Sequence, residues 1–273
     1  MKKNNINFAF FGTPNVASKT LELLKGHGLI PSIIVTAPDR PVGRKQTVTA
    51  PEVKNWAIKN NVPFLQPDKL NNEFKDKISA FNAKIFVVVA YGKIFPEWLI
   101  NLPTSGTLNI HYSLLPKYRG AAPVQYAILN NEKETGVSIQ KMIPELDAGP
   151  LIAQRSLVII SKEKTPELLE KLIIIGADLL SKTIYDYLDN QIKITAQIGD
   201  PSFAPKIKKE DGLINLDDNP MTNFAKFRAF YEWPRIYYIE NNKRFIITDA
   251  DLIDNKFIIK KIIPEGGSEI ILS

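Results

Sequence analysis

The chain contains no cysteine among its 273 residues. This absence excludes disulfides, thiolate nucleophiles and metals held by cysteine. Only two histidines are present, His27 and His111, and they do not have the His-x-x-x-His spacing of a metal site. Neither a GxGxxG motif nor a P-loop occurs, so the sequence gives little support to a nucleotide site. We therefore expect no metal.

Long hydrophobic runs are also missing. No apolar stretch approaches the roughly 20 residues that a membrane-spanning helix needs. The N-terminal segment begins with lysines, but its apolar stretch is short and ends at Gly12-Thr13-Pro14. That ending is typical of a first β-strand and not of a signal peptide. We expect a soluble, cytoplasmic, monomeric protein without a membrane partner.

The charge is uneven along the chain. Lysine and arginine number 35 against 29 aspartate and glutamate, a net charge of +6. Residues 206–273 contain 11 basic and 11 acidic side chains, so the whole excess lies in residues 1–205. A basic excess favours an anionic partner such as nucleic acid or a phosphorylated cofactor, although a solvated lysine-rich surface gives the same number.

Strand-like and helix-like segments alternate through the first two-thirds of the chain. Continuous apolar runs predict buried strands, and apolar residues at helical spacing predict the helices between them. The expected strands are 6–12, 31–37, 84–92, 106–112 and 136–143, and the expected helices are 15–24, 53–61, 123–129 and 166–189. This alternation indicates the α/β class, with a doubly wound and mostly parallel sheet.

The pattern changes at Gln191. Residues 191–205 are polar, contain two prolines and indicate a linker. Beyond them, a short helical stretch at 220–230 precedes three strand-like segments separated by Asn-Asn, Asp-Asn and Gly-Gly turn signals. These features predict a small antiparallel β domain of barrel or sandwich type. The expected division is thus a domain at 1–190, a linker at 191–205 and a second domain at 206–273.

Chemically competent side chains follow the predicted strands. Asn109 and His111 are two residues apart, so they lie on the same face of their strand. Ligands of doubly wound sheets bind at the carboxyl ends of the strands. An amide and an imidazole there suit a reaction that develops negative charge on a carbonyl oxygen. Asp147, in the turn 146–149, could orient the imidazole or accept a proton.

The residues alone leave a structural alternative open. A histidine at a strand end is often only structural, and an aspartate before Ala-Gly is an ordinary turn residue. No covalent nucleophile is evident, so an enzyme of this kind would transfer a group directly to an incoming nucleophile. The residues indicate an α/β enzyme with an Asn-His-Asp trio, and no more.

Longer motifs resemble a known family. The stretch N-x-H-x-S-L-L-P-x-x-R-G-A-A-P at 109–123 resembles the folate-dependent formyltransferases, and residues 134–153 resemble the loop that carries their aspartate. The segments TAPDRPVGRK at 36–45 and RAFYEWP at 228–234 resemble the members of that family that formylate methionyl-tRNA. The resemblance covers nearly the whole chain.

The resemblance implies a Rossmann-like domain followed by an OB-like β-barrel domain, which this chain has in shortened form. It also implies transfer of the formyl group of 10-formyltetrahydrofolate to the α-amine of initiator methionyl-tRNA. Asn109 and His111 would then stabilise the oxyanion, and Asp147 would hold the histidine and help to move the proton.

Binding residues are implied in the same way. The folate pocket would be lined by Ser113, Leu114, Leu115 and Pro116 together with Ala90, Tyr91 and Gly92. The loop that enters the tRNA acceptor end would contribute Arg40, Arg44 and Lys45. The competing interpretations are a sugar-nucleotide N-formyltransferase, a formyl-folate hydrolase and a non-catalytic RNA-binding protein that kept the fold. The neutral charge of residues 206–273 is unexpected for a surface that holds tRNA.

Overall fold

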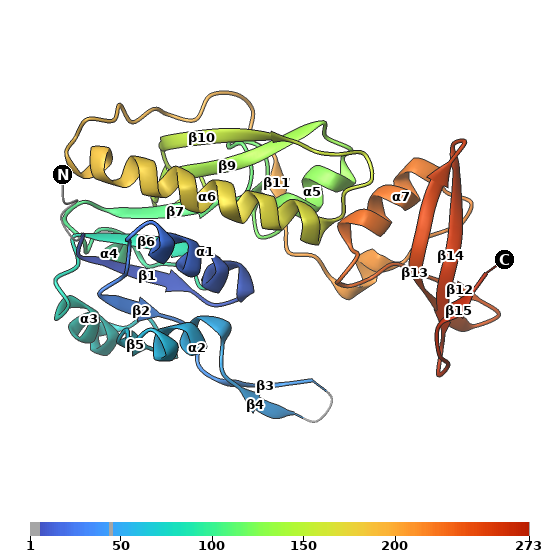
Figure 1. The fold of residues 1–273 in the computed structure, drawn as a ribbon, viewed down its shortest axis with the longest axis horizontal. Coiled ribbons are helices and arrows are strands. Elements are labelled where there is room, and N and C mark those ends of the chain that lie inside the picture. Colours follow the sequence, from blue (N-terminus) through green and yellow to red (C-terminus); the bar gives the residue numbers. More distant parts are fainter. Residues whose placement is uncertain (1–5, 44–45, 273) are drawn as a thin grey trace. The chain divides into compact units, whose positions relative to one another are not determined.

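The computed structural model describes residues 6–43 and 46–272, and Figure 1 shows its fold. The chain forms two compact units, which are described one at a time. The first consists of residues 1–111, 137–155 and 173–199, and the second of residues 112–136, 156–172 and 200–273. The second unit therefore contains more than residues 206–273, and the division expected from sequence remains a prediction.

The helices and strands are distributed along the whole chain. The α-helices are α1 (Asn15–Gly26), α2 (Glu52–Lys59), α3 (Asn72–Ser79), α4 (Glu97–Ile100), α5 (Pro123–Leu129), α6 (Thr165–Leu188) and α7 (Pro220–Ala229), and Lys209–Gly212 form a 3-10 turn, η1. The strands are β1 (Phe8–Gly12), β2 (Ile33–Val35), β3 (Arg40–Val42), β4 (Thr47–Thr49), β5 (Phe64–Leu65), β6 (Ile85–Val89), β7 (Thr107–His111), β8 (Arg119–Gly120), β9 (Glu134–Lys141), β10 (Leu151–Val158), β11 (Phe203–Ala204), β12 (Tyr237–Glu240), β13 (Lys243–Ile253), β14 (Lys256–Pro264) and β15 (Ile270–Ile271).

A seven-stranded sheet organises the first part of the fold, in the order β10-β9-β7-β6-β1-β2-β5. Strand β1 pairs in parallel with β2 and β6, and β6 pairs in parallel with β7. Strand β9 runs antiparallel to β7. The predicted α/β class with a mostly parallel sheet is confirmed.

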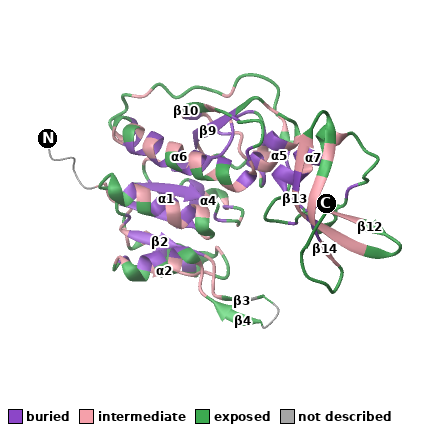
Figure 2. Ribbon diagram, turned by 45° about the vertical axis from the view of Figure 1, so that its right-hand side comes forward, coloured by how far each residue is buried: buried purple, intermediate pink, exposed green. Residues whose placement is uncertain are grey.

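Burial explains why these segments become the central strands. Every residue of β1 (FAFFG) and of β6 (IFVVV) is buried, as expected for parallel strands covered on both faces. In contrast to these buried strands, the hairpin β3–β4 is coloured largely as exposed or intermediate in Figure 2. The sheet therefore forms a rigid support for the loops at the carboxyl ends of its strands.

Some elements were not expected from sequence. Helices α3 and α4 and strand β10 have no counterpart in the predicted list. Helix α3 begins at a normal N-cap, in which the Asn71 side chain accepts a hydrogen bond from the Phe74 amide at 3.1 Å. Residues 39–45 were expected to form a loop, but Arg40–Val42 pair antiparallel with Thr47–Thr49 as a hairpin.

The second unit contains the small antiparallel β domain, which is confirmed. Its sheet has the order β12-β13-β14-β15. Asp254 and Asn255 connect β13 to β14 with φ angles of 49° and 58°. Two successive residues of positive φ make the tight turn that suits the twist of a hairpin. Helix α7 begins with Asn219 as N-cap and Pro220 in its first turn.

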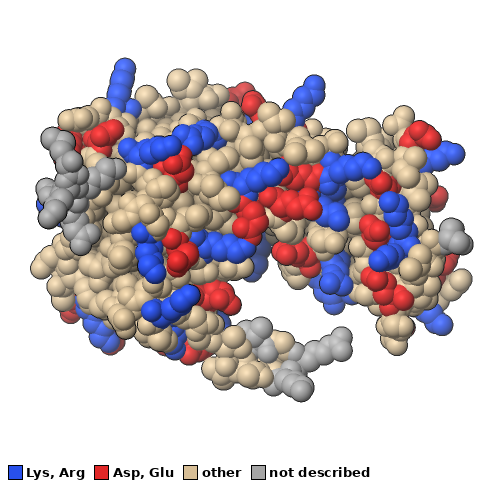
Figure 3. All heavy atoms as spheres, in the orientation of Figure 1, with Lys and Arg blue, Asp and Glu red and all other residues tan. Residues whose placement is uncertain are grey.

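Charged side chains are interspersed on the face drawn in Figure 3. On α6, the carboxylate of Asp178 pairs with Arg155 at 2.7 Å and with Lys182 at 2.8 Å. Such exposed pairs add little to the free energy of unfolding. Basic and acidic side chains are mixed on this face, so the net charge of +6 is not gathered into one basic patch in this view.

Candidate active site

Strand β7 carries the amide and the imidazole predicted from sequence. It lies between β6 and β9, and its register places Asn109 opposite Gln140 and His111 opposite Ser138. The His111 residue is buried, with 5% of its surface exposed, and Asn109 is half-buried. Both side chains therefore come from the carboxyl-terminal part of an interior strand and not from a free loop.

Asp147 lies in the loop after β9, and the structure brings it to both of these residues. Its Oδ1 accepts a hydrogen bond from the Asn109 amide at 3.3 Å. Its Oδ2 lies 3.6 Å from Nδ1 of His111. The two side chains of the Asp147–His111 pair are only 10% and 6% exposed. The three predicted side chains thus form one cluster, although Asn109 and Asp147 are 38 residues apart in sequence.

A buried glutamine completes the cluster, and sequence reasoning missed it. The amide of Gln140 donates to Oδ1 of Asp147 at 2.8 Å, and its carbonyl oxygen accepts the Gly149 amide at 3.1 Å. Gln140 is 1% exposed. A long amide side chain in a predicted buried strand was the available signal, because a buried amide needs hydrogen-bonding partners.

A second missed residue, Gln197, belongs to the segment expected to be only a linker. Its amide donates to the carbonyl oxygens of Asp147 at 2.7 Å and Gly149 at 2.8 Å. Nothing in the local pattern of 191–205 indicates this role, because the partners are about 50 residues away in sequence.

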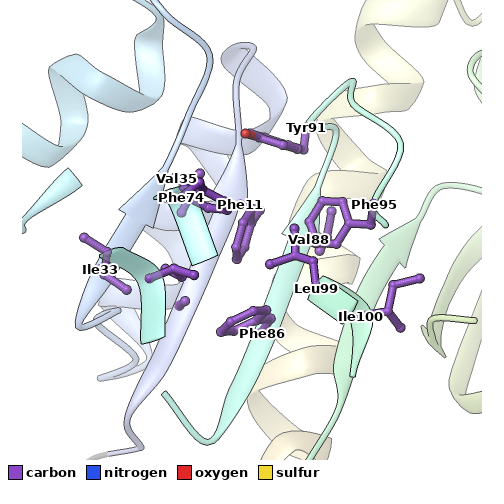
Figure 4. Close-up of a cluster of buried hydrophobic side chains, with 12 residues drawn as sticks. Phe11, Ile33, Val35, Phe74, Phe86, Val88, Tyr91, Phe95, Leu99 and Ile100 are labelled. Carbon is purple, nitrogen blue, oxygen red and sulfur yellow. The ribbon is translucent and has the colours of Figure 1, made fainter. Parts of the chain in front are cut away.

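The segment 90–92 follows β6 and forms an exposed turn. Ala90 and Gly92 both have positive φ, 48° and 79°. The Tyr91 ring points into the core instead, where it packs edge-on against Phe11 and Phe95 with centroids 5.5 and 5.7 Å apart (Figure 4). Burial raises the pKa of Tyr91. A ligand at this turn would therefore contact backbone, and the Tyr91 ring supports the turn from beneath.

The segment 113–116 begins two residues after His111 and belongs to the second unit. Ser113, Leu115 and Pro116 are buried, and Leu114 is half-buried. The Ser113 hydroxyl donates to the Lys117 carbonyl at 2.6 Å, which closes the turn. Within the segment 113–116, Leu114 is thus the residue with substantial exposed surface.

The predicted tRNA loop is the hairpin β3–β4. Arg40 is exposed on β3, whereas Arg44 and Lys45 lie outside the described residues. At the base of the hairpin, Asp39 pairs with Lys54 at 2.6 Å and accepts the Gln66 amide at 2.7 Å. These hydrogen bonds, the one from Gln66 above all, lower the pKa of Asp39.

Other candidate sites are weaker. Among residues 6–43 and 46–272, no group of three or more histidines, aspartates and glutamates is placed to hold a metal ion. Within the same residues, no helix is long and apolar enough to cross a bilayer. A cavity of about 590 Å³ in the second unit, near the start of α6, contains the charged residues Lys162 and Asp251, which pair with each other. None of Asn109, His111 and Asp147 lines that cavity.

The sequence matches two family models. The model described as formyl transferase matches residues 4–184, and that of the formyl transferase C-terminal domain matches residues 206–271. The methionyl-tRNA formyltransferase of Thermodesulfovibrio yellowstonii is 38% identical over 246 residues, which cover 90% of this chain and 80% of that protein.

Solved structures show the same fold. The methionyl-tRNA formyltransferase from Clostridium thermocellum superposes with a TM-score of 0.62 at 16% identity, covering 98% of this chain and 99% of that one. A 4-N formyltransferase from Francisella tularensis superposes with a TM-score of 0.68 at 18% identity, covering 93% and 96% of the two chains. At such identities the likeness concerns the fold alone.

Proposed function

The chain belongs to the formyl transferase family, and we propose that it transfers the formyl group of 10-formyltetrahydrofolate to the α-amine of methionyl-tRNA. The observation that carries the proposal is the contact of Asp147 with both Asn109 and His111 at the end of β7. Folate supplies the formyl group, and the protein supplies the groups that stabilise charge and move a proton.

Asn109 and His111 are assigned to the formyl oxygen. As the amine nitrogen adds to the formyl carbon, this oxygen becomes negative, and fixed hydrogen-bond donors stabilise it. The amide of Asn109 is one donor. Nδ1 of His111 faces Asp147, so Nε2 is the second donor when the ring carries a proton on both nitrogens. Their common origin on one buried strand keeps the two donors at a constant separation.

Asp147 is assigned to the proton. The attacking α-amine loses a proton when the new C–N bond forms, and the nitrogen of folate gains one when its bond to the formyl carbon breaks. An α-amine has a pKa of about 7.7–8.0, so it is partly neutral near pH 7 and needs only a weak base. The Nε2 proton of His111 passes to the folate nitrogen as the bond to the formyl carbon breaks, and the proton lost by the amine replaces it on Nε2. The carboxylate of Asp147 assists by holding the ring at Nδ1.

The folate is assigned to the turn 90–92 and the segment 113–116. Pterin rings suit an apolar slot with a few backbone hydrogen bonds. The exposed turn at Ala90 and Gly92 offers backbone, and Leu114 offers an apolar side chain. The fixed conformation of this turn over the Tyr91 ring supports the assignment.

The tRNA is assigned to the hairpin β3–β4 and its tip, with Arg40, Arg44 and Lys45 contacting phosphates. The identity of 38% to a methionyl-tRNA formyltransferase favours this acceptor over an amino sugar, although a solved sugar N-formyltransferase has the same fold. We further propose that the protein works in the cytoplasm, as a monomer.

A direct assay tests the function. The protein is incubated with 10-formyltetrahydrofolate and charged initiator tRNA, and N-formylmethionine is measured by mass after deacylation. Parallel reactions contain a nucleotide-linked amino sugar, or no acceptor. Formylation of methionyl-tRNA alone is expected. A product only with the amino sugar, or release of formate without an acceptor, would replace the proposed reaction by one of its competitors.

A further inference from the structure

The backbone of Asp147 adopts a conformation that needs support. Its φ is 49°, in the left-handed region that costs free energy for residues other than glycine. Its neighbour Leu146 is 65% exposed, so packing of that side chain does not hold the loop. The loop must be fixed by other contacts if the carboxylate is to stay beside His111.

Gln197 supplies such contacts to the backbone. One amide group donates both of its hydrogens, to the carbonyls of Asp147 and Gly149. The position of Gln197 is itself fixed two residues earlier, where Thr195 and Leu151 exchange backbone hydrogen bonds of 2.7 and 3.1 Å. The connecting segment is thus attached to the start of β10, immediately after the Asp147 loop.

Gln140 supplies the corresponding contacts to the side chain. Its amide nitrogen reaches Oδ1 of Asp147, and Oδ2 is then left facing Nδ1 of His111. Its amide oxygen holds the Gly149 amide, which ties the loop to β9. A side-chain amide can donate to a carboxylate and accept from a backbone amide at once. Glutamate could not donate, and leucine could do neither.

We propose that Gln140 and Gln197 are positioning residues that together hold Asp147 against His111. Gln140 sets the rotation of the carboxylate, and Gln197 sets the backbone from which it projects. The catalytic consequence rests on the proposed function, whereas the geometric consequence for His111 does not.

Kinetics provide the first test. Gln140→Leu should lower kcat by about 10- to 100-fold, since a displacement of about 1 Å in a reacting group can cost 10²-fold. The KM values for folate and tRNA should stay within about twofold, because Gln140 contacts neither substrate. Gln197 is half-buried, so Gln197→Leu is the variant to use if Gln140→Leu fails to fold. It should also lower kcat.

A matched control and a double-mutant cycle separate positioning from general stability. Gln191→Leu replaces an exposed glutamine at the start of the same connecting segment, so kcat should not change. In an Asp147→Ala background, Gln140→Leu should cause no further loss of kcat, because residues that act through one group are not additive. An equal loss in both backgrounds contradicts the proposal.

Histidine spectroscopy gives a readout independent of formyl transfer. The chain has two histidines, so ¹⁵N-histidine labelling yields signals from His27 and His111 only. Gln140→Leu and Gln197→Leu should each move the ring nitrogen signals of His111 and leave those of His27 in place, and Gln191→Leu should move neither.

The two readouts distinguish the possible failures. If the wild-type protein does not formylate methionyl-tRNA but His111 responds to both substitutions, the proposed function is wrong and the positioning stands. If the wild-type protein is active and the His111 signals stay unchanged in folded Gln140→Leu and Gln197→Leu, the positioning is wrong.

Discussion

The carboxylate of Asp147 shows how much of a site depends on hydrogen bonds to one residue. Two amides reach one of its oxygens, at 2.8 and 3.3 Å, and the imidazole faces the other at 3.6 Å. In these contacts the two amides reach Oδ1, and the imidazole faces Oδ2. This division keeps the carboxylate in one orientation and leaves a basic atom directed toward His111.

Removal of an oxyanion donor should reduce turnover far more than stability. Asn109→Ala should lower kcat by about 10²–10³-fold, because a fixed donor is lost in the transition state. Asn109 is half-buried, so its loss should leave the melting temperature nearly unchanged. Steady-state kinetics and thermal melts measure the two effects. Asn101→Ala, at the exposed end of α4, is the control. A rate close to wild type in folded Asn109→Ala would falsify the assigned role.

Gly149 should tolerate no side chain. A Cβ at this position would overlap the carbonyl oxygen of Lys141, whereas a Cβ at Gly26 would meet no atom within 4 Å. Gly149→Ala should lower the free energy of unfolding by about 1–3 kcal/mol through overpacking and should also lower kcat, because the Asp147 loop must move. Gly26→Ala, within helix α1, should raise stability by about 0.5–1 kcal/mol. Urea titrations of both variants test the contrast, and equal stabilities would contradict it.

At the scale of elements, the ends of three neighbouring strands carry different tasks. Strand β6 ends in the exposed turn 90–92, β7 ends in Asn109 and His111, and the loop after β9 carries Asp147. The antiparallel direction of β9 matters here, because it places Gln140 opposite Asn109. A parallel strand in the same place would have followed a long crossover, and its following loop would project differently.

The hairpin β3–β4 gives a prediction for the acceptor substrate. Arg40→Ala should raise KM for methionyl-tRNA and flatten its salt dependence by about 0.7–0.9 in the logarithmic slope, because one phosphate contact is lost. The pair Arg44→Ala and Lys45→Ala should act similarly, with folate binding unchanged. Lys59→Ala, an exposed lysine at the end of α2, removes an equal charge elsewhere. If the hairpin variants retain the wild-type KM and salt slope, an amino-sugar acceptor should be tested next.

At the scale of the whole molecule, stability and charge are spread over many contacts. In the second unit, Asp251 on β13 pairs with Lys162 at 2.8 Å and with Lys260 at 3.3 Å. The hydrogen bond from Lys162 is the main cause that lowers the pKa of Asp251 to about 2. The pair ties the segment before α6 to the antiparallel sheet.

This pair predicts a defined loss of stability in acid. A folded pKa of about 2 lies below the ordinary value of about 3.9, so the contribution is present above pH 4 and is lost as the pH falls toward 2. Asp251→Asn should lower the melting temperature by roughly 1–3 °C at pH 7, and the difference should vanish near pH 2. Asp249→Asn, two residues earlier on β13, is the control. A difference from wild type that is independent of pH would show that charge is not its cause.

The sequence by itself determined the features that depend on near neighbours. Continuous apolar runs determine which strands are buried, and a spacing of two residues places Asn109 and His111 on one face. The absence of cysteine excludes thiol chemistry. The hairpin turn at Asp254-Asn255 follows equally from local turn preferences.

Only the tertiary structure decided which distant segments meet. Asp147 reaches Asn109 because β9 pairs with β7 in one register, and register depends on the packing of whole strands. Gln197 lies in a stretch whose composition indicates a linker, yet its amide holds the Asp147 loop. The local pattern could not show this, because a hydrogen bond between segments 50 residues apart leaves no periodic trace in either of them.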